Sequence, residues 1–385
     1  MKIVIWQSVL TEHQLHTLRA LQTHCENSIE FVIGAQNLAA REKQGWTSSD
    51  FTGLSIHELP HKNWWQAIRT ILHLHADAIH LFGGLWADRR MFFALLKAQT
   101  LGIKTGLITE PYADASVSYF GEHPSLKDRL KTYLRPIAYR LGGWLITRSP
   151  SFVFAISVKA VRQFEKMGFK ADHVFPFGYF VPQAIGQLKP QVESAYTARA
   201  LRLIFVGSLI SRKGLAVLVE AIVKLNRQGL IATLDLYGSG DPSAFVNQSE
   251  HVRFKGLIPF GKVQPIIAAY DILILPSLHD GWGVVVNEAL LQGGPVITSD
   301  AVGASTLIEV SGAGAIFTSG DSSQLAGILS TAAHNPSTLK QWQEAAFNFK
   351  HTLQPEVAGS YMHECLQYAI GDRSNRPVAP WYLAH

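Results

Sequence analysis

The sequence is poor in cysteine and in charged residues. Its 385 residues include two cysteines, and charged residues make up 16% of the chain. Cys25 and Cys365 give neither a metal-ligand spacing nor a disulfide framework, which suits a reducing cytoplasm. Hydrophobic residues make up 47% of the chain, so extensive disorder is not expected. The length allows two domains of ordinary size.

Long apolar runs are missing as well. No run approaches the roughly 20 residues that a membrane-spanning helix needs. The opening "MKIVIWQS" has the pattern of a buried strand, not that of a signal peptide. We therefore expect a cytoplasmic protein that is either free in solution or peripheral on the cytoplasmic face of a membrane.

The chain has a modest excess of positive charge. The net charge is +5 and the isoelectric point is near 9.1. The basic residues are spread along the chain and the sequence contains no recognisable nucleic-acid-binding module, so no nucleic-acid partner is expected. Anionic small ligands or anionic lipids explain the excess at least as well.

Short apolar strands alternate with amphipathic helices, which is typical of an α/β protein with parallel sheets. The expected strands of the first half are "KIVIW", "IEFVIGA", "AIHLFG", "KTGLIT" and "FVFAIS". Those of the second half are "RLIFVGSL", "ATLDLYGSGD", "VRFKGLI", "DILILPS", "PVITSD" and "AGAIFT". We predict two Rossmann-like domains at residues 1–186 and 201–355. A linker at 187–200 joins them, and a helical tail at 356–385 packs back on the first domain.

Three segments of the second half carry candidate binding chemistry. In "FVGSLISRKG" a strand ends at Gly207 and a helix is expected to begin near Ser211, which places Arg212 and Lys213 at its N-terminus. Cations beside free backbone amides make an anion site. The alternative is an ordinary solvated basic turn.

The second segment, "LYGSGD", places Gly238 and Gly240 directly after a strand, where the backbone can approach a ligand. It is not the G-x-G-x-x-G fingerprint, so a dinucleotide cofactor is poorly supported. The alternative is a simple turn.

The third segment, "HDGWGVVVNEALLQGGPVITSD", is the most specific. Gly281 and Gly283 leave the first amides of a helix beginning near Val284 open to a diphosphate, with no metal required. Glu288, one turn further on, can accept hydrogen bonds from a ribose diol. Asp280 stands where it can bind hydroxyls of a transferred sugar. The alternative makes Asp280 a loop cap and Glu288 a surface residue.

These segments together resemble the donor-binding domain of the retaining glycosyltransferases of family 4, which have the GT-B fold. That resemblance implies two Rossmann-like domains facing each other across a cleft, the first binding the acceptor and the second a nucleotide sugar. The donor-binding residues that it implies are Gly207, Ser208, Gly238, Gly240, Leu257, Gly281, Gly283, Val284, Val285 and Glu288.

Two positions depart from the family pattern. The arginine that follows the glycine in the family is Ser208 here, so its phosphate contact is either lost or supplied by Arg212. The first carboxylate of the family is usually glutamate and is Asp280 here, shorter by one methylene. The second departure bears on which sugar is bound and how it is oriented.

The first half offers fewer candidates. The family histidine after the strand "KTGLIT" has Glu110 as its nearest counterpart, which either replaces its hydrogen bond to the sugar or caps the loop. His13, in the first turn of the first helix, either contacts acceptor or phosphate or is a neutral surface residue. His80 is expected to be a satisfied core residue.

An amphipathic stretch runs from Leu126 to Trp144. Its apolar stripe is flanked by basic residues, a pattern that fits an interfacial helix on anionic lipid. The alternative is a core-facing helix with a solvated basic flank. The stripe comprises Leu126, Leu130, Tyr133, Leu134, Ile137 and Leu141, and the membrane candidates are Lys127, Lys131, Arg135, Arg140 and Trp144.

The sequence therefore predicts a metal-independent, retaining hexosyltransferase. Its donor is a nucleotide diphosphate sugar, UDP in preference to GDP. Its acceptor is a hydroxyl of a growing, lipid-linked glycan of the kind made in polysaccharide or lipopolysaccharide synthesis. Lys213, Arg212, Asp280, Glu110 and His13 are its candidate catalytic residues. The alternatives are a nucleotide-sugar epimerase of the same fold and a non-catalytic nucleotide-sugar-binding module.

Overall fold

The computed structural model describes residues 1–25, 29–35, 51–83, 88–111, 152–184, 201–259, 261–371 and 373–383, with residues 126, 130, 133–134, 137–138 and 140–142. The chain forms two compact units. The first contains Met1–Tyr112, Leu130–Phe180 and Pro355–Pro380, and the second contains Ala113–Arg129, Val181–Gln354 and Trp381–His385. The first unit is therefore built from segments far apart in the sequence.

The first unit is organised around a parallel sheet of seven strands in the order β3-β2-β1-β4-β5-β6-β7. The order reverses between β1 and β4, and such a switch point is where open α/β sheets bind ligands. The strands are β1 Ile3–Gln7, β2 Ile29–Ile33, β3 Ser55–Glu58, β4 Ile79–Phe82, β5 Thr105–Thr109, β6 Phe152–Ile156 and β7 Val174–Phe177.

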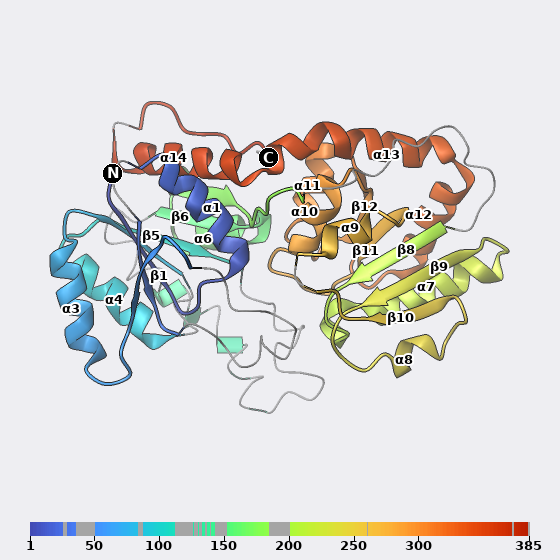
Figure 1. Ribbon diagram of the computed structural model, residues 1–385, viewed down its shortest axis with the longest axis horizontal. Helices are drawn as coiled ribbons and strands as arrows, with labels where there is room; N and C mark the ends of the chain where they lie inside the picture. The colour runs from blue at the N-terminus through green and yellow to red at the C-terminus, as the bar shows by residue number, and fades with distance from the viewer. Residues whose placement is uncertain are drawn as a thin grey trace. The chain divides into compact units, whose positions relative to one another are not determined.

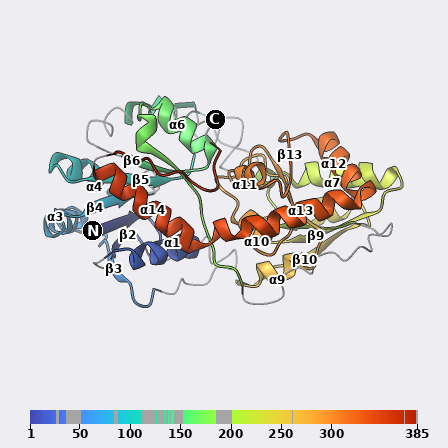
Figure 2. The same cartoon turned by 90° about the horizontal axis from the view of Figure 1, so that it is seen from above.

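Helices cover this sheet, and the last one comes from the far end of the sequence. They are α1 Glu12–Thr23, α3 Trp64–Leu74, α4 Arg89–Thr100, α6 Val158–Lys166 and α14 Pro355–Ile370. Helix α14 runs beside α1 in both ribbon views (Figure 1, Figure 2). A Cβ atom on Gly359 would lie 2.8 Å from the Cβ of Ala20, so glycine is what lets the two helices approach so closely.

The predicted core role of His80 is confirmed. The indole nitrogen of Trp6 donates to its Nδ1 at 2.9 Å, so Nε2 carries the proton and donates to the carbonyl of His75, also at 2.9 Å. The residue is fully buried, and burial lowers its pKa to about 4. His80 is a neutral, satisfied part of the core.

The second unit has its own parallel sheet, in the order β10-β9-β8-β11-β12-β13. Its strands are β8 Leu201–Val206, β9 Ala232–Tyr237, β10 Val252–Gly256, β11 Ile272–Leu275, β12 Val296–Ser299 and β13 Gly314–Phe317 (Figure 1). Its α-helices are α7 Leu215–Arg227, α8 Ser243–Val246, α9 Val263–Ile267, α10 Val284–Leu291, α11 Ser305–Ser311, α12 Ser322–His334 and α13 Pro336–Phe349. Trp381 packs in this unit, 1% exposed, with its carbonyl accepting from Thr306.

The sequence missed two strands of the first unit, and both lie at an edge of the sheet. Strand β3 is partly exposed and lacks an apolar run, because an edge strand can face solvent. Strand β7 contains Pro176, which an edge strand tolerates because its outer side needs no amide donor.

Within the described residues, no helix is long and apolar enough to cross a membrane. The described positions between residues 126 and 142 are helical. All six apolar side chains of the predicted stripe are exposed, from 49% for Leu134 to 85% for Leu126. Arg140 is exposed too, whereas Lys127, Lys131, Arg135, Trp144 and the predicted linker 187–200 lie outside the described residues.

Candidate functional site

Three loops of the second unit meet at the carboxyl ends of β8, β9 and β11. Strand β8 lies between β9 and β11, so the chain leaves it in opposite directions at this point. The loop after β8 contains Gly207 and Lys213, the loop after β9 contains Gly238, and the loop after β11 contains Asp280. The chemistry that the sequence singled out therefore gathers at the switch point of this sheet.

The glycine loop after β9 is packed directly on the loop after β8. A Cβ atom on Gly238, where φ is +149°, would lie 1.8 Å from the carbonyl oxygen of Gly207. The amide of Leu209 donates to the carbonyl of Ser239 at 2.7 Å. The hydroxyls of Ser208 and Ser239 lie 3.5 Å apart. Only glycine allows this contact, which brings backbone and two hydroxyls together at the sheet edge.

The predicted helix start near Ser211 was wrong. Residues Ser211–Lys213 form a 3-10 turn, and α7 begins at Leu215 after Gly214. Gly214 has φ +68°, and a Cβ atom there would lie 2.0 Å from the carbonyl oxygen of Pro276. The chain must therefore turn at Gly214 before the α-helix can begin, and Arg212 and Lys213 precede that helix.

The loop after β11 is fixed by its neighbours. The amide of Asp280 donates to the carbonyl of Ala301 at 3.1 Å, and the carbonyl of Asp280 accepts from Gly303 at 3.0 Å. Arg212 donates to the carbonyl of His279 at 2.7 Å. Arg212 thus holds the loop that carries Asp280, a role that the sequence did not reveal.

Lys213 and Asp280 form an ion pair. Their Nζ and Oδ2 atoms are 2.5 Å apart, and the two side chains are 16% and 13% exposed. The sequence placed the two residues at one site, but they are 67 positions apart in the chain and nothing local predicted a direct contact. A cation and a carboxylate are thereby held side by side at a partly exposed sheet edge.

Helix α10 begins where the sequence predicted, at Val284. Its N-cap Gly283 has φ +94° and provides no side-chain cap, so the amides of Val284 and Val285 have no acceptor within the helix. Gly283, Val284 and Val285 are partly exposed, whereas Gly281 and Val286 are buried. The open first turn therefore presents amide donors at the surface, and Val286 packs inside.

Glu288 lies one turn along α10 and is half-buried. Its carboxyl makes no hydrogen bond or ion pair with any described residue. Removal of water from this carboxyl raises its pKa to about 8. A desolvated carboxyl without a hydrogen-bond partner lowers the stability of the protein unless a ligand binds to it. The interpretation of Glu288 as an ordinary surface residue therefore does not fit the structure.

The remaining predicted donor residues border the same sheet edge. Gly240 has φ +126° and packs on Leu209. Leu257, just after β10, is 54% exposed. Trp282 and Asn287 were not singled out by the sequence. The indole of Trp282 donates to the amide oxygen of Asn287 at 2.9 Å, and this buried pair fixes the start of α10.

The candidates of the first unit lie at the carboxyl ends of its own strands. Glu110, just after β5, accepts a hydrogen bond from Tyr179 at 2.7 Å, so its carboxylate anchors the loop. His13 lines a small cavity with Gln7, Thr17 and Tyr179. The buried side chains of Gln7 and Thr17 each leave one polar atom without a partner among the described residues.

A metal site is not evident in the described part of the chain, where no three His, Cys, Asp or Glu side chains gather in a ligating arrangement. The positively polarised groups at the switch point are the backbone amides at the start of α10 and the ammonium group of Lys213.

Sequence comparison finds a family match within the second unit. Residues 200–335 match the family described as "Glycosyl transferases group 1". The amylovoran biosynthesis glycosyltransferase AmsK of Erwinia amylovora is 32% identical over 142 residues, which cover 34% of this chain and 35% of that protein. The chain aligns with 26% to 41% of the length of these curated relatives.

Structural comparison extends the likeness to both units. The crystal structure of Anabaena HepE in complex with UDP and glucose matches with a TM-score of 0.66 at 17% identity, covering 95% of this chain and 99% of that one. The lipopolysaccharide outer core galactosyltransferase WaaB matches with a TM-score of 0.64 at 16% identity, covering 96% and 99%. The chain has the GT-B fold, and its residues 200–335 are similar to the group 1 glycosyltransferases.

Proposed function

We propose that the protein is a retaining, metal-independent glycosyltransferase that moves a hexose from UDP-sugar to a hydroxyl of a growing glycan. The observation that carries this proposal is the desolvated, unpartnered carboxyl of Glu288, one turn behind the open first turn of α10. A nucleotide sugar supplies what each group lacks: a ribose diol for the carboxylate and a diphosphate for the amides.

The diphosphate would lie against the amides of Val284 and Val285, with Lys213 nearby. During transfer the bond between the anomeric carbon and the diphosphate oxygen breaks while the acceptor oxygen bonds to that carbon. Negative charge grows on the leaving diphosphate, which takes up the proton of the acceptor hydroxyl. Fixed amides and an ammonium group stabilise that charge more in the transition state than in the ground state, which lowers the barrier. Because these groups already meet the charge, we propose that no divalent metal is required.

Asp280 would bind hydroxyls of the transferred sugar. Its ion pair with Lys213 supports this assignment, because the pair holds a sugar-binding carboxylate beside a phosphate-binding cation, as a sugar diphosphate requires. When the donor enters, the diphosphate would bind the ammonium group of Lys213. The sugar hydroxyls would then take the place of that ammonium group at the carboxylate of Asp280. Arg212 positions this loop through His279 and need not contact phosphate itself.

The identities of donor and acceptor are supported by likeness. HepE binds UDP and glucose, which favours a UDP-hexose. AmsK is named for amylovoran biosynthesis and WaaB for the lipopolysaccharide outer core, which favours a glycan acceptor in surface-polysaccharide synthesis. Retention of the anomeric configuration rests on the resemblance to family 4. We assign Glu110 to anchoring its loop, and His13 to the neighbourhood of the acceptor.

We also propose that the exposed stripe from Leu126 to Leu141 rests on anionic lipid at the cytoplasmic face of the membrane. Six large apolar side chains at helical spacing are exposed, which disfavours the core-facing alternative. Such a contact would bring the enzyme to lipid-linked acceptors. Replacing Leu130 and Ile137 by serine should abolish sedimentation with anionic vesicles, whereas the same change at exposed Ile231 should not.

The activity is tested by incubating the purified protein with UDP-glucose and UDP-galactose, with and without glycan acceptors. A transferase releases UDP in step with a new glycosidic bond, whose configuration is read by NMR, and its activity survives EDTA. Isomerised nucleotide sugar without acceptor would instead identify an epimerase, and binding with no turnover of any donor a non-catalytic module. Inversion at the anomeric carbon, or activity restored only by Mg²⁺ or Mn²⁺, would refute the corresponding part of the proposal.

A further inference from the structure

A second pocket lies at the carboxyl ends of β1 and β2 in the first unit, built entirely from residues of that unit. Its volume is about 360 Å³, within the range of small-molecule sites. The turns at Ser8 and Gly34 contribute backbone, and the side chains of His61, Trp64 and Arg89 contribute the chemistry. Such a volume suits one or two sugar rings.

One charged pair in this pocket is already neutralised. Arg90 donates to Asp88 from both Nε and Nη2, at 2.7 to 3.1 Å, and also to the carbonyls of Leu59 and Gly34. Burial acts to raise the pKa of Asp88, but the hydrogen bonds from Arg90 outweigh it and hold that pKa below its ordinary value. This pair locks β2 and the loop after β3 to the start of α4 and leaves no net charge.

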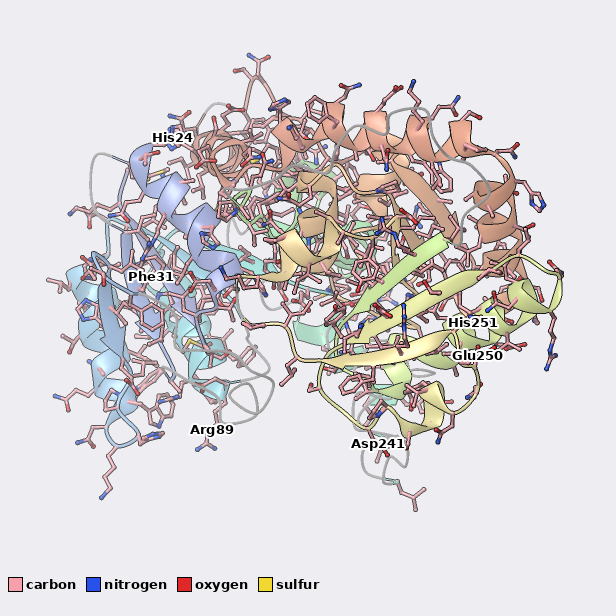
Figure 3. The ribbon with its side chains drawn as sticks, turned by 45° about the vertical axis from the view of Figure 1, so that its right-hand side comes forward. His24, Phe31, Arg89, Asp241, Glu250 and His251 are labelled. Carbon is pink, nitrogen blue, oxygen red and sulfur yellow. The ribbon has the colours of Figure 1, made fainter. Side chains whose placement is uncertain are left out.

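The charge that remains is positive. Arg89 is exposed, makes no hydrogen bond or ion pair with any described residue, and extends away from the ribbon in Figure 3. His61 is exposed beside it. Helices α3 and α4 both begin at this pocket, and the N-cap of α3, Asn63, provides no side-chain cap. The N-terminus of α4 is already capped by the Asp88 carboxylate, which accepts from the backbone amide of Arg90 at 2.9 Å. The uncapped N-terminus of α3 and the guanidinium of Arg89 remain, and both favour an anion.

An aromatic wall completes the pocket. Trp64 is partly exposed and is held in place by Trp65 and Phe93, whose ring centroids lie 5.9 and 6.0 Å from its own. A fixed indole gives an apolar surface at little cost in conformational entropy. The C–H groups on one face of a pyranose ring are the natural complement of such a surface.

We propose that this pocket binds an anionic sugar residue of the acceptor, one that carries a carboxylate or a phosphate group. Arg89 pairs with the anionic group, in the two-pronged geometry that guanidinium offers to both carboxylate and phosphate. Trp64 contacts the ring that carries it. This inference rests on the proposed function, because it names the class of acceptor that the transferase takes.

The experiment compares matched probes on the full-length protein. Cellobiouronic acid and cellobiose differ in one carboxylate, and glucose 6-phosphate supplies the phosphate alternative. Binding is measured by ligand-observed NMR for the wild type, Arg89→Gln and Trp64→Leu. The matched controls are Arg69→Gln, on the exposed face of α3, and Trp342→Leu, a partly exposed tryptophan of α13 in the second unit.

We expect an anionic probe to bind at least about tenfold more tightly than cellobiose, as a charge-assisted pair implies. Arg89→Gln should remove that preference and Trp64→Leu should weaken both probes, whereas the two controls should bind like the wild type. Binding of cellobiouronic acid identifies a uronate, and binding of glucose 6-phosphate alone identifies a phosphosugar. Equal binding of cellobiose and the anionic probes, or equal effects of Arg89→Gln and Arg69→Gln, would overturn the inference.

A separate titration with UDP distinguishes this inference from the proposed function. The donor residues belong to the second unit and the pocket belongs to the first. Arg89→Gln should therefore bind UDP as the wild type does. Failure of every variant to bind UDP would count against the donor site, while the probe comparison would still decide the pocket.

Discussion

Donor binding should depend on pH through Glu288. With a pKa of about 8, this carboxyl is about nine-tenths protonated at pH 7 in the unliganded protein. If the ribose diol is held by the ionised form, binding must first remove that proton. The apparent dissociation constant at pH 7 should then be about tenfold higher than at pH 9, a difference of about 1.4 kcal/mol.

The assay is calorimetric titration of UDP-glucose from pH 6 to pH 9. A nucleotide sugar is preferred to free UDP because the terminal phosphate of UDP itself titrates at about pH 6. The affinity should rise about ninefold from pH 6 to pH 7 and about fivefold from pH 7 to pH 8, and at pH 7 about 0.9 proton should be released for each donor bound. Proton release is read by repeating the titration in buffers of different ionisation enthalpy.

Glu288→Gln is the decisive variant. It should weaken donor binding and remove both the pH dependence and the proton release. It should also stabilise the unliganded protein. Because the folded-state pKa is raised from 4.5 to about 8, the folded protein loses stability as pH rises through that window. At pH 7 the unfolding free energy of the glutamine variant should exceed that of the wild type by roughly 2–3 kcal/mol, a range lowered to allow for the partial exposure of the Glu288 side chain. A flat affinity across pH 6 to 9, or a slope that persists in the variant, would refute the assignment.

Three further predictions concern other parts of the molecule. Lys213→Ala should lower kcat by roughly 10²-fold, because it removes a charge that stabilises the transition state. Lys224, which pairs with Glu220 on α7, provides the control, and Lys224→Ala should leave kcat unchanged. Gly238→Ala should lower unfolding free energy by about 3 kcal/mol, and Gly229→Ala, which meets no atom within 4 Å, by about 1 kcal/mol; equal losses in chemical denaturation would contradict the predicted close contact. Burial lowers the pKa of His80 from 6.5 to about 4, so the unfolding free energy should fall by about 3 kcal/mol as pH falls between those values. A His80→Gln variant with the same acid-unfolding profile would show that His80 does not cause this loss.

The sequence predicted the second unit better than the first. All six expected strands of the second half are present, since each is a short apolar run in the middle of an alternating pattern. Helix α10 begins at Val284 as expected, because two glycines and a following Gly-Gly-Pro bound it on both sides. In the first half, β3 was missed because it is partly exposed and has no apolar run, and β7 was missed because Pro176 interrupts its short buried run.

The site residues could be named from the sequence, but their interactions could not. The contacts that matter join residues far apart in the chain, as Lys213 joins Asp280 and Arg212 joins the carbonyl of His279. The turn at Gly214 depends on the carbonyl of Pro276, which local propensity does not register. The raised pKa of Glu288 reflects the atoms around it, and no spacing along a helix reports that.

The return of α14 to α1 also has a consequence for synthesis on the ribosome. The first unit is complete through Phe180 except for its last segment, Pro355–Pro380, which begins with α14, and the 174 residues 181–354 emerge in between. At about 5–20 residues per second, roughly 9–35 seconds pass before α14 can reach its place. During that time Ala20, which α14 contacts through Gly359, lacks that covering. The nascent chain therefore exposes an apolar helix face while the second unit is made, and a chaperone that recognises such surfaces would find it there.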